Sequence, residues 1–147
     1  MGQQQLLLVI LVTIIVGIAT VVALNVFGTS AKNANIDAVR QDMLSIATSA
    51  QGWFIKPKMM GGGGNSFTGM TFYDITFPFK SSIDSVTVFN MNGTYQLDTS
   101  GGTNFTITAF PSSDAGYDTT KTSGIPYMEA TVTNNNVTWV TGHKNPN

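Results

Sequence analysis

The sequence has a long apolar run near its start, and the segment that follows mixes apolar and polar residues at a regular spacing. No charged residue precedes Lys32, and the run from Leu6 to Phe27 contains nothing more polar than Thr13, Thr20 and Asn25. In a helix this run would be about 33 Å long at about 1.5 Å per residue, which is enough to cross the hydrocarbon core of a bilayer. The pattern therefore predicts a helix that lipid or other subunits must bury.

A second helical pattern follows, in which apolar residues recur at steps of three and four, the spacing of one helix face. This apolar stripe consists of Ile36, Val39, Met43, Ile46, Ala47, Ala50 and Phe54. The opposite, polar face is expected to hold Lys32, Asp37, Arg40, Gln41, Asp42 and Ser49. The stripe predicts that this part of the helix lies on a globular domain.

No proline separates the two patterns, so we expect one continuous helix from about Gly2 to Ile55. Gly17 and Gly28 are the expected places for bending or local melting, because each glycine costs about 1 kcal/mol relative to alanine in a helix. The helix should end at Lys56-Pro57, since proline disfavours helical geometry in the residue before it. The glycines that follow predict a flexible linker rather than a phosphate-binding loop, which would need a following lysine and helix.

From Phe67 onward, short runs rich in Val, Ile, Thr, Phe and Tyr alternate with turn residues, which is typical of strands. Strands are predicted at 71–77, 85–90, 94–97, 104–110, 128–133 and 137–141. Asn92-Gly93 and Asn134-Asn135 are predicted two-residue hairpin turns, because Asn and Gly accept the positive φ that such turns require. An antiparallel meander covered by the apolar stripe is the simplest topology.

These patterns together predict an α+β fold, in which a long N-terminal α-helix is combined with a C-terminal antiparallel β-sheet head. The apolar half of the helix is expected to protrude and the amphipathic half to pack on the head. The predicted parts are an apolar membrane-anchor or filament-core helix (1–27), its amphipathic continuation (28–56), a Gly-rich linker (57–66) and a β-rich globular head (67–147).

Composition excludes several classes of function. Net charge is −1 and only 10% of residues are charged, against about 25% in an ordinary soluble chain, so we expect no specific nucleic-acid ligand. There is no cysteine, which excludes structural disulfides, thiolate metal sites and thiol nucleophiles. Low charge suits a protein that packs against copies of itself.

Candidate catalytic and metal-binding groups are sparse. His143 is the only histidine and has no obvious Ser/Asp constellation beside it, so we expect no enzyme activity. Asp114 and Asp118 lie four residues apart in the stretch from Pro111 to Pro126, but the further acidic ligands of a calcium loop are missing. We therefore expect solvated turn residues there, with no metal and no cofactor.

In its N-terminal part the chain resembles the type IV pilin superfamily. The matching features are Gly2, then Gln3-Gln4-Gln5, then the uninterrupted stretch LLLVILVTIIVGIA, followed by an amphipathic helical continuation and a β-rich head. The resemblance implies that a prepilin peptidase cuts after a glycine, here Gly2. It also implies that the apolar half-helix holds the subunit in the inner membrane until assembly machinery packs identical subunits into an extracellular filament.

The resemblance implies a specific set of residues for the core of that filament. This assembly helix comprises Gln3, Gln4, Gln5, Leu6, Leu7, Leu8, Ile10, Leu11, Ile14, Ile15, Gly17, Ile18, Val21, Val22 and Leu24. Most members of the family carry a glutamate at the fifth mature position, whereas this chain has Leu7 there if Gly2 is the cleavage site, or Gln5 if Met1 is the mature start. The usual C-terminal pair of cysteines is also missing.

The sequence leaves three functions open. The first is a major pilin-like subunit of a filament at the cell surface, a plan that serves adhesion, motility and DNA uptake alike. The second is a minor pilin or secretion-system pseudopilin, and the third is a single-pass membrane-anchored β-domain that binds a ligand or sugar. Possible glycosylation sites of an exported protein are Asn92, Asn104 and Asn136, although the composition would give as many by chance.

Overall fold

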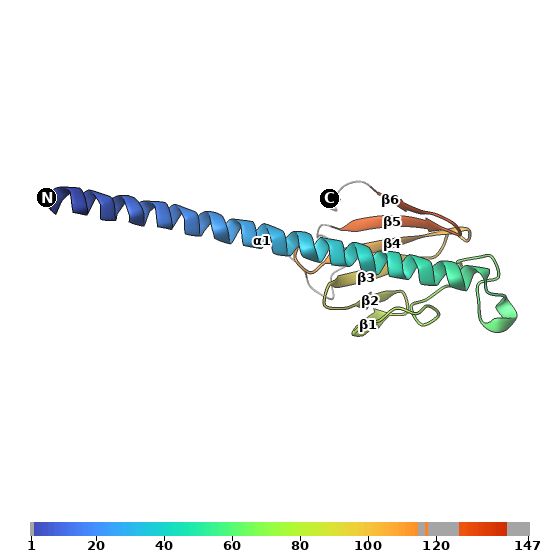
Figure 1. Cartoon of the computed structure of the whole chain (residues 1–147). Coiled ribbons are helices and arrows are strands. Elements are labelled where there is room, and N and C mark those ends of the chain that lie inside the picture. Colours follow the sequence, from blue (N-terminus) through green and yellow to red (C-terminus); the bar gives the residue numbers. More distant parts are fainter. Residues whose placement is uncertain (1, 115–116, 118–126, 141–147) are drawn as a thin grey trace. The chain divides into compact units, whose positions relative to one another are not determined.

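The computed structural model describes residues 2–114, 117 and 127–140. It contains helix α1 (Gly2–Ile55), the short 3-10 helix η1 (Lys58–Met60) and strands β1 (Ser81–Asp84), β2 (Thr87–Phe89), β3 (Gly93–Asp98), β4 (Asn104–Pro111), β5 (Met128–Thr133) and β6 (Val137–Trp139). The strands form one antiparallel sheet in the order β1-β2-β3-β4-β5-β6 (Figure 1). The predicted α+β class and meander are confirmed.

The chain divides into two compact units, Met1–Ala34 and Asn35–Asn147. In the first unit, α1 is α-helical from Gly2 onward, and the helix is unbroken at Gly17 and Gly28. The apolar side chains of this unit are exposed, from 47% at Ile10 to 73% at Phe27. They therefore bury nothing within the described part of the chain.

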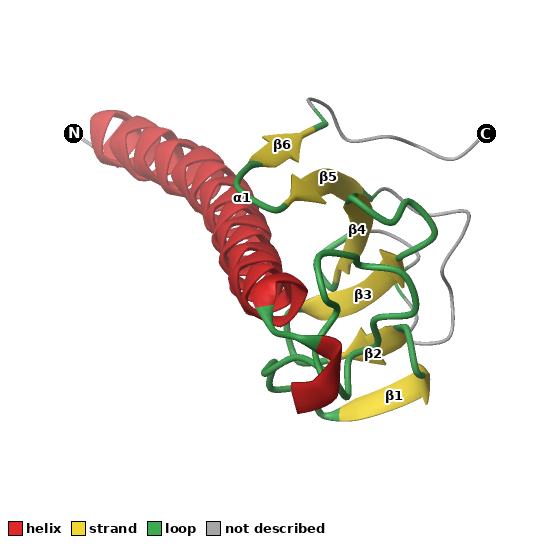
Figure 2. Ribbon diagram, turned by 90° about the vertical axis from the view of Figure 1, so that its right-hand side faces the viewer, coloured by secondary structure: helices red, strands yellow, loops and turns green. Residues whose placement is uncertain are grey.

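In the second unit, the C-terminal half of α1 lies on one face of the sheet (Figure 2). The predicted stripe is confirmed, since six of its members are buried, namely Val39, Met43, Ile46, Ala47, Ala50 and Phe54, and Ile36 is half-buried. The sheet contributes alternate residues of its central strands to the same core: Tyr95, Leu97, Phe105, Ile107, Ala109, Met128, Ala130 and Val132. Burying each large apolar side chain contributes about 1.5–3 kcal/mol.

The predicted strand at 71–77 is wrong, because this segment forms turns. The Asp74 carboxylate accepts hydrogen bonds from the Thr71 backbone N–H at 2.9 Å and the Thr71 hydroxyl at 2.7 Å, which stabilises a reverse turn instead of an extended chain. Phe72 and Phe77 are still buried in the core. Apolar content predicted their burial correctly and their backbone conformation wrongly.

Strands β1 and β2 also differ from expectation, whereas β3, β4 and β5 are close to it. Strand β6 ends at Trp139, although the predicted strand runs to 141. Strand β1 was not predicted, because only Ile83 in it is a large apolar residue and the strand is mostly exposed. The predicted strand at 85–90 is shortened to β2, since the Asp84 carboxylate accepts the Val86 N–H at 2.9 Å and forms a turn there. Edge strands bury one side poorly and therefore carry a weak sequence pattern.

Both predicted hairpins exist, but their turns are not the predicted type. Between β2 and β3, the Asn90 N–H bonds to the Gly93 carbonyl at 3.0 Å, so the turn is shifted one residue toward the N-terminus. Between β5 and β6, the Thr133 N–H bonds to the Asn136 carbonyl at 2.9 Å, as a loop of Asn134-Asn135 requires. Among described non-glycine residues only Asn65 has a positive φ, so the asparagines act through side-chain bonds.

The glycine-rich segment after η1 folds back and forms hydrogen bonds with the C-terminal end of α1, so it is not a flexible linker there. The N–H groups of Gly63, Gly64 and Asn65 donate to the last carbonyls of the helix region at 2.8, 3.0 and 2.8 Å. These carbonyls have no partner inside the helix. A Cβ on Gly63 would overlap the Ser66 carbonyl oxygen and the Trp53 ring, so the absence of side chains permits this close approach.

Candidate assembly surface

The predicted assembly helix lies entirely in the first unit, on α1, and all its members are exposed. Gly2 is the first residue of α1, and Gln3, Gln4 and Gln5 form its first turn. By length and composition α1 can cross a membrane. A continuous apolar surface of this size marks contact with lipid or with protein, so the helix is compatible with a membrane anchor or signal.

The polar side chains inside the apolar run mostly bond to the helix that carries them. The hydroxyl of Thr13 donates to carbonyls three and four residues earlier at 2.8 and 3.0 Å. Thr20 donates four residues back at 2.8 Å, and Thr29, just after the run, does so at 3.0 Å. These hydroxyls need no partner outside the helix, so they present mainly a methyl group to their surroundings.

The second unit holds its helix with a polar row that flanks the apolar stripe. Asn35, Asp42 and Ser49 are seven residues apart, so they lie on one side of the helix, and each bonds to the head. The Asn35 amide donates to the Asn92 carbonyl at 2.9 Å, and the Ser49 hydroxyl donates to the Thr76 carbonyl at 3.0 Å. This polar row fixes the helix against the sheet.

Asp42 is the centre of the polar row. Its carboxylate oxygen Oδ2 accepts hydrogen bonds from Asn90 Nδ2 at 2.9 Å, Asn92 Nδ2 at 2.7 Å and the Tyr95 hydroxyl at 2.6 Å. The prediction that Asp42 and Ser49 lie on the polar face opposite the stripe is therefore wrong, because both are half-buried beside the stripe and bond to the head. Burial, and then the hydrogen bond to Asp42, raise the pKa of Tyr95 far above its usual range, so Tyr95 stays protonated and donates.

The three possible glycosylation sites differ in surroundings. Asn92 is half-buried, and its Nδ2 atom, to which a sugar would be attached, already donates to Asp42. Asn104, at the start of β4, and Asn136, after the β5–β6 turn, are both exposed. A sugar on Asn92 requires loss of the Asp42 contact, and a sugar on Asn136 requires loss of a 3.5 Å hydrogen bond from its Nδ2 atom to the Thr138 hydroxyl. Asn104 carries no such conflict among the described residues.

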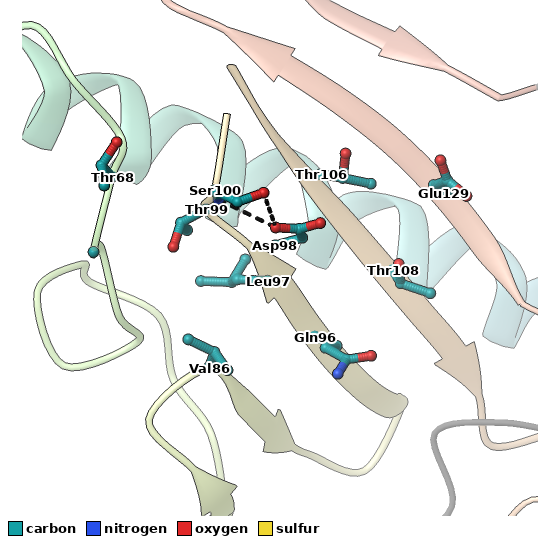
Figure 3. Close-up of a pocket in the computed structure, with 11 residues that line it drawn as sticks. Thr68, Val86, Gln96, Leu97, Asp98, Thr99, Ser100, Thr106, Thr108 and Glu129 are labelled. Carbon is teal, nitrogen blue, oxygen red and sulfur yellow. Dashed lines mark hydrogen bonds between the residues drawn. The ribbon is translucent and has the colours of Figure 1, made fainter. Parts of the chain in front are cut away.

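A shallow open depression of about 750 Å³ lies on the sheet face away from the helix (Figure 3). Its lining is mostly hydroxyl, amide and carboxylate side chains: Thr68, Gln96, Asp98, Thr99, Ser100, Thr106, Thr108 and Glu129, with Gly69, Val86 and Leu97. The Asp98 carboxylate accepts the Ser100 hydroxyl at 2.7 Å and N–H at 3.1 Å, which hold the pKa of Asp98 below its usual range. Such groups suit hydrogen bonding to a polar ligand.

This depression was not predicted from the sequence, although alternating polar residues in two neighbouring strands indicate a polar sheet face. Gln96 and Asp98 on β3, and Thr106 and Thr108 on β4, are the polar members of two alternating strands, so they share one face. Among the described residues, no three His, Asp or Glu side chains gather as a metal site. His143 and Asp118 lie outside the described residues. Asp114 is buried, so the prediction that it is a solvated turn residue is wrong.

No family model, curated protein or solved structure matches the chain. Its function is therefore inferred from two features of the described residues. The N-terminal half of α1 is apolar and exposed, and the C-terminal half of α1 packs on the sheet of the head.

Proposed function

We propose that this protein is a structural, major pilin-like subunit of an extracellular type IV pilus-like filament. The observation that carries the proposal is the stretch from Leu6 to Phe27, which is fully helical and exposed along its whole length. It continues without a break into a helix that is packed on a folded head. The C-terminal half of α1 therefore packs on the sheet, and the apolar N-terminal half requires a partner outside the described chain.

In this proposal the apolar N-terminal half of α1 is buried first by lipid and later by other copies of the chain. Before assembly, lipid of the inner membrane covers it, since its length matches the roughly 30 Å hydrocarbon core. After cleavage by a prepilin peptidase, with Gly2 as the proposed leader site, the assembly machinery transfers it into a bundle of identical helices. At about 25 cal/mol per Å² of apolar surface removed from water, this burial is the main drive for association.

The lack of charge in this half suits burial in a helix bundle as well as burial in lipid. Gln3, Gln4 and Gln5 provide hydrogen-bonding groups at the start of the helix without the cost of burying a charge. In the proposed filament they orient the incoming subunit in place of the family's usual carboxylate.

Electron microscopy of material sheared from cells that express the chain tests the proposal. We expect uniform filaments composed chiefly of this chain, and mass spectrometry of its N-terminus should show the mature start. Ile18→Asp, which places a charge at a 62% exposed position of the run, should abolish filaments, and the matched control Ile18→Leu should retain them. A wild-type chain found only in the membrane fraction, without filaments, would refute the proposal.

Filaments in which this chain is scarce would instead assign it to the minor pilins or pseudopilins. Quantitative mass spectrometry of purified filaments distinguishes these cases, because a major subunit accounts for most of the protein mass. The two roles share one fold, so copy number is the deciding quantity.

A second function, a membrane-anchored surface domain that binds a sugar, is favoured by the polar depression on the outer sheet face. Its hydroxyl, amide and carboxylate groups match the hydroxyls of a polyol, although its open form suits weak binding. The test is a glycan array probed with the full chain and with Asp98→Ala. Binding that this variant removes, by a chain that is monomeric in detergent, would support this function over filament assembly.

A further inference from the structure

Asn25 is the polar side chain of the apolar run that the helix itself does not satisfy. The hydroxyls of Thr13 and Thr20 bond to carbonyls of their own helix. The side-chain amide of Asn25 is exposed and makes no hydrogen bond to any described residue, although its backbone carbonyl accepts from Thr29. An amide carries two donors and one acceptor oxygen, so this position has the largest unmet demand for hydrogen bonds in the run.

From this we infer that Asn25 bonds to a neighbouring copy of the chain and thereby fixes the axial register of the assembled helices. The inference rests on the proposed function, because it requires a bundle of identical helices. Within such a bundle water is excluded, and an amide without a partner is strongly disfavoured. The nearby Thr29 hydroxyl of the same helix already donates to the Asn25 backbone carbonyl, so the amide bonds to a group of another copy.

The position of Asn25 explains why the same residue is tolerated before assembly. Measured along the helix, Asn25 lies about 29 Å from Leu6 at about 1.5 Å per residue, close to the thickness of the hydrocarbon core. In the membrane the amide thus lies at the water interface and is hydrated. On transfer into a filament it loses that water and needs a protein partner.

Register control follows from the otherwise featureless surface of this helix. Leu, Ile and Val side chains pack at many axial offsets with similar energy, so they favour association without defining one arrangement. A single buried asparagine in a helix bundle selects the offsets that satisfy its amide, as it does in coiled coils. Such a selection favours filaments with one rise and one twist.

Three variants expressed in the native filament system test the inference by helical reconstruction. Asn25→Val removes the amide at similar size and should give filaments with a mixture of rises and twists, that is, loss of a single helical symmetry. Val26→Thr is the matched control, because its hydroxyl should bond to its own helix as those of Thr13 and Thr20 do. It should retain the wild-type rise and twist.

The outcomes are decisive in each case. Asn25→Val filaments with the single wild-type symmetry would overturn the inference, as would an equal loss of symmetry in Val26→Thr. If Asn25→Val gives no filaments, Asn25→Gln decides, since restored filaments of one symmetry support the need for an amide and their absence contradicts it. A wild-type chain that forms no filaments refutes the proposed function itself, which is a distinguishable result.

Discussion

Asp42→Asn tests the polar row that attaches the helix to the sheet. One carboxylate oxygen of Asp42 accepts three hydrogen bonds, from Asn90, Asn92 and the hydroxyl of the fully buried Tyr95. Asparagine keeps the size of the side chain but removes its charge and replaces one oxygen with a donor. The substitution therefore changes the hydrogen bonds with little effect on packing.

The expected loss can be worked out from these contacts. Hydrogen bonds to a charged group contribute about 1.5–3 kcal/mol and neutral ones about 0.5–1.5 kcal/mol, so each retained bond weakens by about 1 kcal/mol. If the Tyr95 hydroxyl loses its acceptor, a further 1–3 kcal/mol or so is lost, because water does not reach it. The bonds from Asn90 and Asn92 together lose about 2 kcal/mol, so we expect the free energy of unfolding to fall by about 3–5 kcal/mol, which lowers Tm by about 12–20 °C for a domain of this size.

Thermal unfolding of the full chain in detergent, followed by tryptophan fluorescence, measures this loss. The matched control is Asp37→Asn on the same helix, where the carboxylate is 74% exposed and pairs with Arg40 at 3.2 Å. An exposed pair of this kind contributes under about 1 kcal/mol, so Tm should hardly change. An Asp42→Asn variant as stable as the Asp37→Asn variant would refute the role assigned to Asp42.

Three further substitutions have defined outcomes. Gly63→Ala should lower the free energy of unfolding by about 1–3 kcal/mol, because its Cβ overlaps the Trp53 ring; a chemical-denaturation midpoint equal to wild type would contradict the capping role. Met43→Ala, at a position 1% exposed, should cost about 2–5 kcal/mol by the same measurement, and a loss below that range would mean the helix is loosely packed. Folding raises the pKa of Tyr95 above its ordinary value of 10.0. The contribution of its hydroxyl to the free energy of unfolding is therefore complete below pH 10 and declines above it, by about 1.4 kcal/mol per pH unit. Tyr95→Phe should remove this decline in urea titrations between pH 10 and 11.5, and an unchanged slope would show that other groups cause it.

The helix and its buried face were predictable because periodicity alone determines them. Val39, Met43 and Ile46 recur at the helical repeat, and any sheet beneath them accepts such a stripe. The central strands were predictable for the same reason, since Phe105, Ile107 and others alternate at period two. In these segments the backbone geometry and the burial pattern agree.

The polar row was not predicted because its partners come from distant parts of the chain. Asp42 is polar and borders the stripe, so its hydropathy alone places it in solvent, whereas Tyr95 supplies the donor that holds it at the edge of the core. The seven-residue spacing from Asn35 to Ser49 was the available signal. The turn around Asp74 was missed for a related reason, because one side-chain acceptor outweighed a strand-like run of apolar residues.

The threonines that bond to their own helix have a mechanical consequence. Since Thr13 and Thr20 keep their hydroxyls on the helix backbone, two such helices can slide along each other without breaking hydrogen bonds between them. In a filament built on this surface, a shift between subunits would break no hydrogen bond from these two threonines. The amide of Asn25 would oppose such a shift, because the shift would separate it from its partner.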